Sequence, residues 1–162
     1  MPQIIKNDAV IEDQWTLIDD EQPFAENAFV ILPLDRWLNV IQSNNPYDKI
    51  GVHLAADTDM TTLSDDVLKS PLIAVHFPTF MDGRGFSIAR ILRDEKGYTG
   101  ELRAVGYVIR DQLCYLKRCG FNAYALENTD LQAALESLSD FTESYQIAAD
   151  TPQPLFRRRS AS

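Results

Sequence analysis

The residues whose types and spacing could support binding or catalysis lie between positions 82 and 121. This block combines a loop with two glycines, two helical patterns, one strand pattern and a concentration of arginine. Arginines near strand ends and helix starts can bind an anion or a partner's carboxylate, because the guanidinium presents several donors in a planar fork. The candidates for binding an anion or a protein partner are Asp82, Arg84, Ser87, Arg103, Arg110 and Asp111. Their types indicate a kind of ligand and no particular reaction.

The loop between residues 78 and 85 is the first candidate anion site. Gly83 and Gly85 flank Arg84, and Ser87 follows near the predicted start of a helix. Backbone N–H groups at a helix start could hold an anion, with Arg84 supplying positive charge. Alternatively, both glycines merely allow a tight turn from strand to helix. The spacing fits neither the dinucleotide-binding glycine motif nor the phosphate-binding P-loop.

Arg103 is the second candidate, because it interrupts a predicted buried strand. A central parallel strand is expected to be apolar on both faces, and burying an unpaired guanidinium is costly. One interpretation is structural: Arg103 pairs with a nearby carboxylate such as Glu101 or Asp111. The other interpretation is functional: Arg103 contacts a ligand or a protein interface.

Arg110 and Asp111 open the next predicted helix, on the same expected sheet edge as Asp82 and Arg84. Two arginines and two aspartates suit a salt-bridge network as well as a binding site. Catalysis finds no support in the residue types, because Ser87 has no histidine partner to act as a base. The sequence therefore identifies no catalytic residues.

The histidines and cysteines predict neither a metal site nor a redox centre. His53 and His76 have no carboxylate beside them at metal-site spacing. His76 ends a predicted strand and could face the functional edge, but a hydrogen-bonded structural histidine is the preferred interpretation. Cys114 and Cys119 lie about 140° apart around a helix, so they would not converge on one metal or form a disulfide there. We therefore predict no metal and no cofactor.

Strands and helices that could position these residues alternate from residue 29 onward. The predicted strands are short, mostly apolar and bounded by Gly, Pro or Asp: 29–32, 50–54, 72–77, 101–105 and 123–126. The predicted helices lie near 35–42, 64–69, 86–94 and 109–119, with a last one from Thr129, where Gln132 gives a capping-box spacing. Residues 4–18 are expected to contain a short hairpin around Asn7 and Asp8.

This alternation predicts an α/β domain with about five parallel strands and right-handed crossovers. Five units are too few for a closed eight-stranded barrel, so an open doubly wound sheet or a partial barrel remains. Residues 1–146 form the predicted single domain, including the hairpin. Residues 147–162 are predicted to be a flexible basic tail, which either docks on an acidic partner or is solvated. The functional edge is expected at the carboxyl ends of the strands.

The composition of the 162 residues sets the class of protein. A formal net charge of −9 argues against general nucleic-acid binding, because contacts to phosphates need a basic surface. No run of about 18 apolar residues would span a membrane. The start of the chain lacks the basic and apolar segments of a secretory signal. We therefore expect a cytoplasmic protein.

The central block resembles a bacterial family of unknown function, DUF934. The matching segments are Pro71-Leu72-Ile73-Ala74-Val75, Asp82-Gly83-Arg84-Gly85, Gly97-Tyr98, Gly100-Glu101-Leu102-Arg103-Ala104-Val105-Gly106, Arg110-Asp111-Gln112-Leu113 and Arg118-Cys119-Gly120-Phe121. Weaker similarity extends over most of the chain. The family is often labelled an oxidoreductase involved in sulfite reduction. The resemblance thus implies a pathway, cysteine biosynthesis from assimilated sulfur, and no reaction.

The residues narrow what that label can mean. Reducing sulfite to sulfide is a multi-electron reaction that uses a haem-like centre and an iron–sulfur cluster, and two cysteines cannot supply four thiolates. We therefore expect an accessory protein that binds or supports the assimilatory sulfite reductase. The alternative is a small protein or enzyme that binds a sulfur oxyanion through Arg84, Arg103 and Arg110. A third possibility is oxidoreductase activity with a borrowed cofactor.

Overall fold

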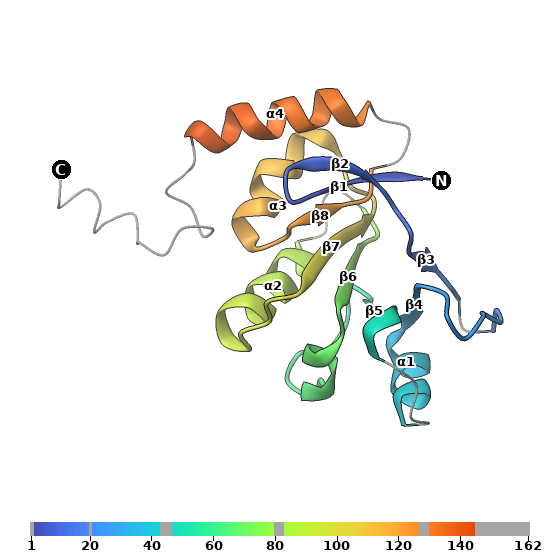
Figure 1. Cartoon of the computed structure of the whole chain (residues 1–162). Coiled ribbons are helices and arrows are strands. Elements are labelled where there is room, and N and C mark those ends of the chain that lie inside the picture. Colours follow the sequence, from blue (N-terminus) through green and yellow to red (C-terminus); the bar gives the residue numbers. More distant parts are fainter. Residues whose placement is uncertain (1, 20, 43–46, 80–82, 127–129, 145–162) are drawn as a thin grey trace.

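The computed structural model describes residues 2–19, 21–42, 47–79, 83–126 and 130–144 (Figure 1). Three of the sequence predictions fall outside these residues. They concern Asp82 as a site residue, Thr129 as a helix cap and the basic tail from residue 147.

The described strands form one sheet of eight. Its order is β2 (Ala9–Glu12), β1 (Gln3–Lys6), β8 (Ala123–Tyr124), β7 (Glu101–Gly106), β6 (Leu72–Phe77), β5 (Ile50–Leu54), β4 (Val30–Pro33) and β3 (Thr16–Leu17). Strands β3 to β8 pair in parallel, each beside its predecessor in the chain. The hairpin of β1 and β2 joins the sheet through an antiparallel pairing of β1 with β8.

Helices connect the parallel strands. Longer helical segments are α1 (Leu34–Ile41), α2 (Arg84–Arg90), α3 (Leu113–Cys119) and α4 (Leu131–Ser144). Shorter 3-10 turns cover Tyr47–Lys49, Asp65–Lys69 and Arg110–Gln112, and a π-helical turn, Ile91–Glu95, extends α2.

Local sequence signals explain several of these boundaries. Asn7 and Asp8 both have positive φ, as the tight turn of a two-residue hairpin requires. The Ser64 side chain accepts the N–H of Asp66 and caps the following 3-10 turn, as predicted. Gly120 ends α3 in the left-handed conformation. At the start of the last helix, the Asp130 carboxylate accepts the N–H groups of Gln132 and Ala133.

The order of the strands requires a strongly curled sheet. β2 and β3 lie at opposite edges, yet only residues 13–15 separate them in sequence. A chain can cross from residue 12 to residue 16 over at most about 14 Å. The edges of a flat sheet of this size would lie about 34 Å apart. The sheet is therefore a half-barrel, and residues 13–17, which we call the strap, cross its open side.

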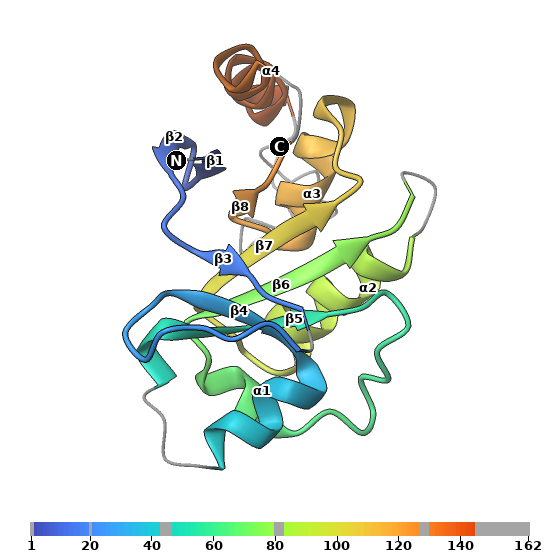
Figure 2. The ribbon, with the colours of Figure 1, turned by 90° about the vertical axis from the view of Figure 1, so that its right-hand side faces the viewer.

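The two faces of the half-barrel have different cores. The convex face carries the main core, which contains every buried apolar residue of the described helices, including Trp37, Leu92 and Leu116. The concave face carries a small separate cluster of Ile31, Leu72, Ala74 and Val105, packed against Trp15 and Ala125. Figures 1 and 2 show the strap on the side of the sheet opposite α2 and α3.

The prediction of a partial barrel is confirmed, and that of a doubly wound sheet is wrong. Sequential strand order with crossovers of one hand places all the connecting helices on one face, whereas double winding needs a reversal of order. The five predicted strands and the hairpin are present. β3 was missed, because two residues with exposed side chains carry no strand pattern. Within the described part of the chain, no helix combines the length and apolar character needed to cross a membrane.

Candidate functional site

A pocket of about 290 Å³ lies between the strap and the concave face of the sheet. The strap supplies one wall and strands β4, β6 and β7 supply most of the other. The lining residues are Asp13, Trp15, Leu17, Ile31, His76, Arg103, Val105, Gly106 and Ala125. We call this the concave pocket. It occupies the interior of the half-barrel, toward the carboxyl ends of its strands.

Arg103 is the charged residue at the centre of this pocket. Its side chain is only 3% exposed. The Nε and one terminal nitrogen contact Oε2 of Glu101, both at 2.8 Å. The other terminal nitrogen donates to Oδ2 of Asp13 at 3.0 Å. Lys6 contacts the second oxygen of Glu101 at 2.9 Å. The prediction of pairing with Glu101 is confirmed, whereas Asp13, and not Asp111, supplies the second carboxylate.

These four side chains form an electrically balanced group. Lys6 and Arg103 contribute two positive charges, and Glu101 and Asp13 contribute two negative charges. Burial of charge is tolerated only when the charges are paired and hydrogen-bonded. A parallel sheet accommodates Arg103 here because the strap, and not a helix layer, covers the concave face.

His76 places a second polar group beside the pocket. It belongs to β6 and pairs with Val105 of β7, two residues further along that strand than Arg103. Its Nδ1 atom is buried and has no hydrogen-bond partner among the described residues. The prediction of a hydrogen-bonded structural histidine therefore finds no support at this nitrogen. Buried polar groups are usually hydrogen-bonded, so this nitrogen is an unused donor or acceptor beside the pocket.

Gly106 keeps the space beside His76 open. Its φ of +89° is one that side chains rarely adopt. A Cβ atom there would lie 2.6 Å from the carbonyl oxygen of Phe77 and 3.0 Å from Nδ1 of His76. Glycine at this position is therefore required by backbone conformation and by space at once.

His53 lies next to His76 on the same face, with ring centroids 5.3 Å apart. Burial, and secondly the neighbouring His76, lowers the pKa of His53 to about 4. His53 is consequently neutral at pH 7. Its Nε2 atom is buried and has no hydrogen-bond partner within the described chain.

The remaining wall of the concave pocket is apolar. Trp15 packs edge-on against Phe29, with ring centroids 5.2 Å apart, and also packs against the small apolar cluster of the concave face. Asp13 accepts the backbone N–H of Trp15 at 3.0 Å, so one aspartate orients the indole segment and binds Arg103. The pocket therefore offers a charged end and an apolar side.

The other predicted site residues lie elsewhere. Arg84 and Ser87 are exposed on α2, and Asp111 is exposed in the turn before α3. Arg110 donates to the hydroxyl of Ser137, which ties that turn to α4. Of the five described candidates, Arg103 alone lines the concave pocket. The structure separates it from the other predicted arginines.

The two glycines around Arg84 differ in the space around them. Neither has a positive φ, so neither supplies a turn that only glycine can form. A Cβ on Gly85 would lie 2.5 Å from the Phe77 ring, whereas one on Gly83 would meet nothing within 4 Å. Gly85 therefore allows α2 to pack closely on the end of β6.

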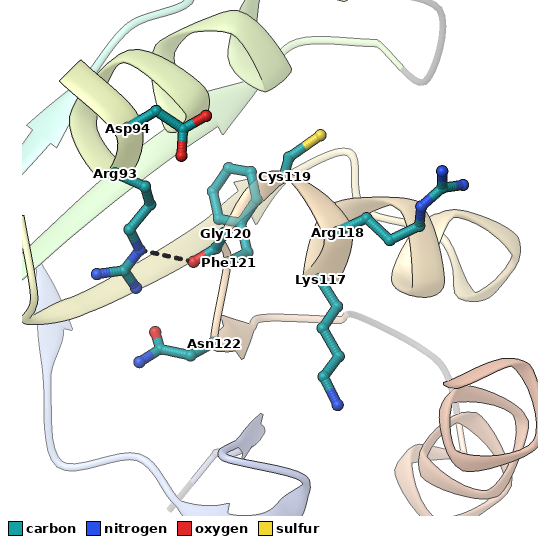
Figure 3. A pocket seen from close by; sticks show the side chains of 8 residues that line it. All are labelled: Arg93, Asp94, Lys117, Arg118, Cys119, Gly120, Phe121 and Asn122. Atoms are coloured by element: carbon teal, nitrogen blue, oxygen red, sulfur yellow. Dashed lines mark hydrogen bonds between the residues drawn. The ribbon is translucent and has the colours of Figure 1, made fainter. Parts of the chain in front are cut away.

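A second pocket, of about 320 Å³, lies where α3 meets the loop before β8 (Figure 3). Arg93 dominates it and donates to the carbonyl oxygens of Tyr98, Gly100 and Gly120 at 2.8–2.9 Å. Asn122 accepts the N–H of Leu102 at 2.8 Å. Figure 3 shows Arg118 extending away from Arg93. The polar groups of this pocket thus hold the loops together.

Both cysteines lie on α3, within the helix predicted near residues 109–119. Cys114 and Cys119 are free thiols. Burial is the main cause that raises the pKa of Cys119, which makes it a poor nucleophile.

Sequence reasoning missed Asp13 and Trp15 as site residues. They follow the predicted hairpin and precede a strand of two residues, so no periodic pattern marks them. The pair of Asp13 and Arg103 spans 90 positions. The one sequence signal for this site was Arg103, because a buried guanidinium needs carboxylate partners.

Residues 51–156 match the model of a family described as bacterial protein of unknown function (DUF934), and the chain belongs to this family. Searches of curated proteins and of solved structures find no significant match. The matched range includes His53, His76 and Arg103, and the strap precedes it.

Proposed function

We propose that this member of the DUF934 family binds a small oxyanion in the concave pocket and serves assimilatory sulfite reduction as an accessory protein. Arg103 and His76 are the residues that we assign to the oxyanion. The main support for this assignment is a buried arginine that shares its pocket with a histidine whose Nδ1 atom has no hydrogen-bond partner among the described residues.

The chemistry of the two groups fits an oxyanion. A guanidinium N–H and an imidazole N–H both donate, and an oxyanion offers several acceptor atoms around one centre. His76 needs its proton on Nδ1 to donate into the pocket. Hydrogen bonds of this kind to a charged ligand contribute about 1.5–3 kcal/mol each.

The pathway part of the proposal is supported by the resemblance in the central block. Its longest matching segment, Gly100-Glu101-Leu102-Arg103-Ala104-Val105-Gly106, contains the β7 strand that carries the guanidinium. The sulfite label of the family makes sulfite the first oxyanion to test. An apolar side wall also leaves room for an oxyanion that carries a small apolar group.

Calorimetric titration with sulfite, sulfate and phosphate tests the site. We expect saturable binding to the wild-type protein, weakened about tenfold or more in His76→Leu, because that change removes a charge-assisted hydrogen bond at nearly constant volume. The matched control is Arg84→Ala, which changes the other predicted anion site and leaves the concave pocket intact. Binding lost in Arg84→Ala and kept in His76→Leu would place the site at the start of α2 instead.

A growth experiment tests the pathway separately. Cells without the gene should grow on sulfide or cysteine as sulfur source and fail on sulfate or sulfite. Normal growth on all four sources would contradict a role in sulfite reduction, and would leave the oxyanion site to be judged by calorimetry. Recovery of the sulfite reductase with the tagged protein would support the accessory role directly.

A further inference from the structure

We propose that Asp13 is an internal competitor of the ligand: its carboxylate occupies the place on Arg103 that the oxyanion takes, so that the ligand binds by exchange. This inference rests on the proposed function of the concave pocket. The inference names a residue that controls the affinity of the pocket. It also predicts which ligand charge the pocket prefers.

The geometry of Arg103 singles out one exchangeable position. Glu101 contacts the Nε side of the guanidinium and is itself held by Lys6. Asp13 contacts the remaining terminal nitrogen at 3.0 Å. Asp13 also lines the pocket, whereas Glu101 does not. A ligand that enters the pocket therefore meets the guanidinium where Asp13 holds it.

The balance of charge favours exchange over simple addition. The group of Lys6, Glu101, Arg103 and Asp13 is neutral. Adding an anion beside both carboxylates would leave a net negative charge in a buried site, which is strongly unfavourable. Replacing the Asp13 carboxylate by a singly charged oxyanion keeps the group neutral. The pocket should accordingly prefer a singly charged ligand over a doubly charged one.

The two carboxylates differ in their freedom to move. Glu101 belongs to β7, which is hydrogen-bonded on both sides within the sheet. Asp13 belongs to residues 13–15 of the strap, which lie between β2 and β3 and form part of neither strand. The backbone N–H of Asp13 donates to the carbonyl oxygen of Pro2 at 2.8 Å, and that of Thr16 donates to the carbonyl oxygen of Phe29 at 3.0 Å. Segments with few backbone bonds open locally at low cost.

The pair of variants Asp13→Asn and Asp8→Asn isolates the competition. Asp13→Asn removes the competing charge and keeps an oxygen for the N–H of Trp15. Asp8→Asn removes an aspartate of the hairpin turn that pairs with Lys117 at 3.1 Å, outside the concave pocket. Asparagine also tolerates the positive φ of position 8. Both variants lose one negative charge, so a general electrostatic effect would appear in both.

Calorimetry with sulfite at constant ionic strength gives the decisive comparison. We expect Asp13→Asn to bind at least about tenfold more tightly than the wild type, and Asp8→Asn to bind equally well. Equal affinity of all three proteins would overturn the competition and leave the oxyanion site standing. Absence of binding in all three would overturn both proposals. Binding by Asp13→Asn alone would mean that the competitor is strong, and would support the inference.

Tryptophan fluorescence of the wild-type protein gives a second test that needs no variant. Trp15 lies on the strap and is half-buried, whereas Trp37 is fully buried behind the sheet. Saturation with methanesulfonate, a singly charged oxyanion that absorbs no near-ultraviolet light, should shift the emission to longer wavelength as the strap moves toward water. Chloride at equal ionic strength should have no such effect. An unchanged spectrum at a methanesulfonate concentration that saturates calorimetric binding would contradict displacement of the strap.

Discussion

Arg103 is a buried charge that determines which side chains must lie around it. A guanidinium that is 3% exposed must be paired, and the structure supplies Glu101 from the same strand and Asp13 from the strap. The pairing with Asp13 also fixes the path of the chain across the half-barrel. One buried charge therefore links the stability of the fold to the shape of the pocket.

Replacing Arg103 by methionine should destabilise the protein by about 3–5 kcal/mol, because it leaves two carboxylates with one cation inside the half-barrel. Urea denaturation followed by circular dichroism measures this change. Lys69→Met is the control, since Lys69 forms an exposed pair with Asp66 that should contribute less than about 1 kcal/mol. Similar losses of unfolding free energy in both variants would show that the buried charged group stabilises the fold no more than an exposed ion pair does.

His53 should make the stability fall as the pH falls. Its pKa is about 4 in the folded protein and 6.5 when unfolded, so between these values the unfolded chain binds the proton more readily. The stabilisation is fully present above about pH 6.5 and is lost as the pH approaches 4, by about 2–3 kcal/mol. We expect the gap in unfolding free energy between wild type and His53→Gln to shift by that amount between pH 7 and pH 4. A gap that does not depend on pH would contradict a buried neutral histidine.

At the scale of elements, the sequence predicts those parts that have a local cause. β5 and β6 have the bounds that their apolar runs predict, and Ser64 and Gly120 cap the elements as expected. β3 could not be predicted, because two exposed residues become a strand only through their pairing with β4. The order of the strands likewise follows from pairing across the sheet and has no local signal.

The end of β7 should tolerate no side chain at Gly106. Gly106→Ala combines a strained φ with contacts of 2.6 and 2.9 Å, to Phe77 and His76. Gly97→Ala is a matched control, because Gly97 also has positive φ, +70°, but meets nothing within 4 Å. We expect a loss of about 1 kcal/mol for Gly97→Ala and at least about twice that for Gly106→Ala, measured by chemical denaturation. Equal losses would show that space beside His76 is not limiting.

Arg110 acts as a tether for α4 in this structure. Arg110→Ala removes its hydrogen bonds to Ser137 and should speed amide hydrogen exchange in the described part of α4, with a global loss below about 1 kcal/mol. Hydrogen exchange read by mass spectrometry measures the local effect. Unchanged exchange in α4 would argue that the apolar contacts of Ala134 and Leu138 hold the helix alone.

At the scale of the whole molecule, the half-barrel and its strap create the candidate site together. The curled sheet brings its two edges within reach of residues 13–15, and the chain that crosses between them covers the concave face. The sequence could indicate Arg103 as unusual, yet it could not show which carboxylate closes the site. That partner lies 90 positions away, and only the curl of the sheet brings it near.

A titration of the ¹⁵N-labelled protein with sulfite, followed by amide NMR spectra, tests the central claim most directly. We predict that the largest shifts fall on the concave pocket, in residues 13–17 of the strap, at His76 and in residues 103–106 of β7. The start of α2, from Arg84 to Ser87, should shift little. Shifts concentrated on that helix start, or no shifts at any described residue, would contradict the assignment of the oxyanion to Arg103 and His76.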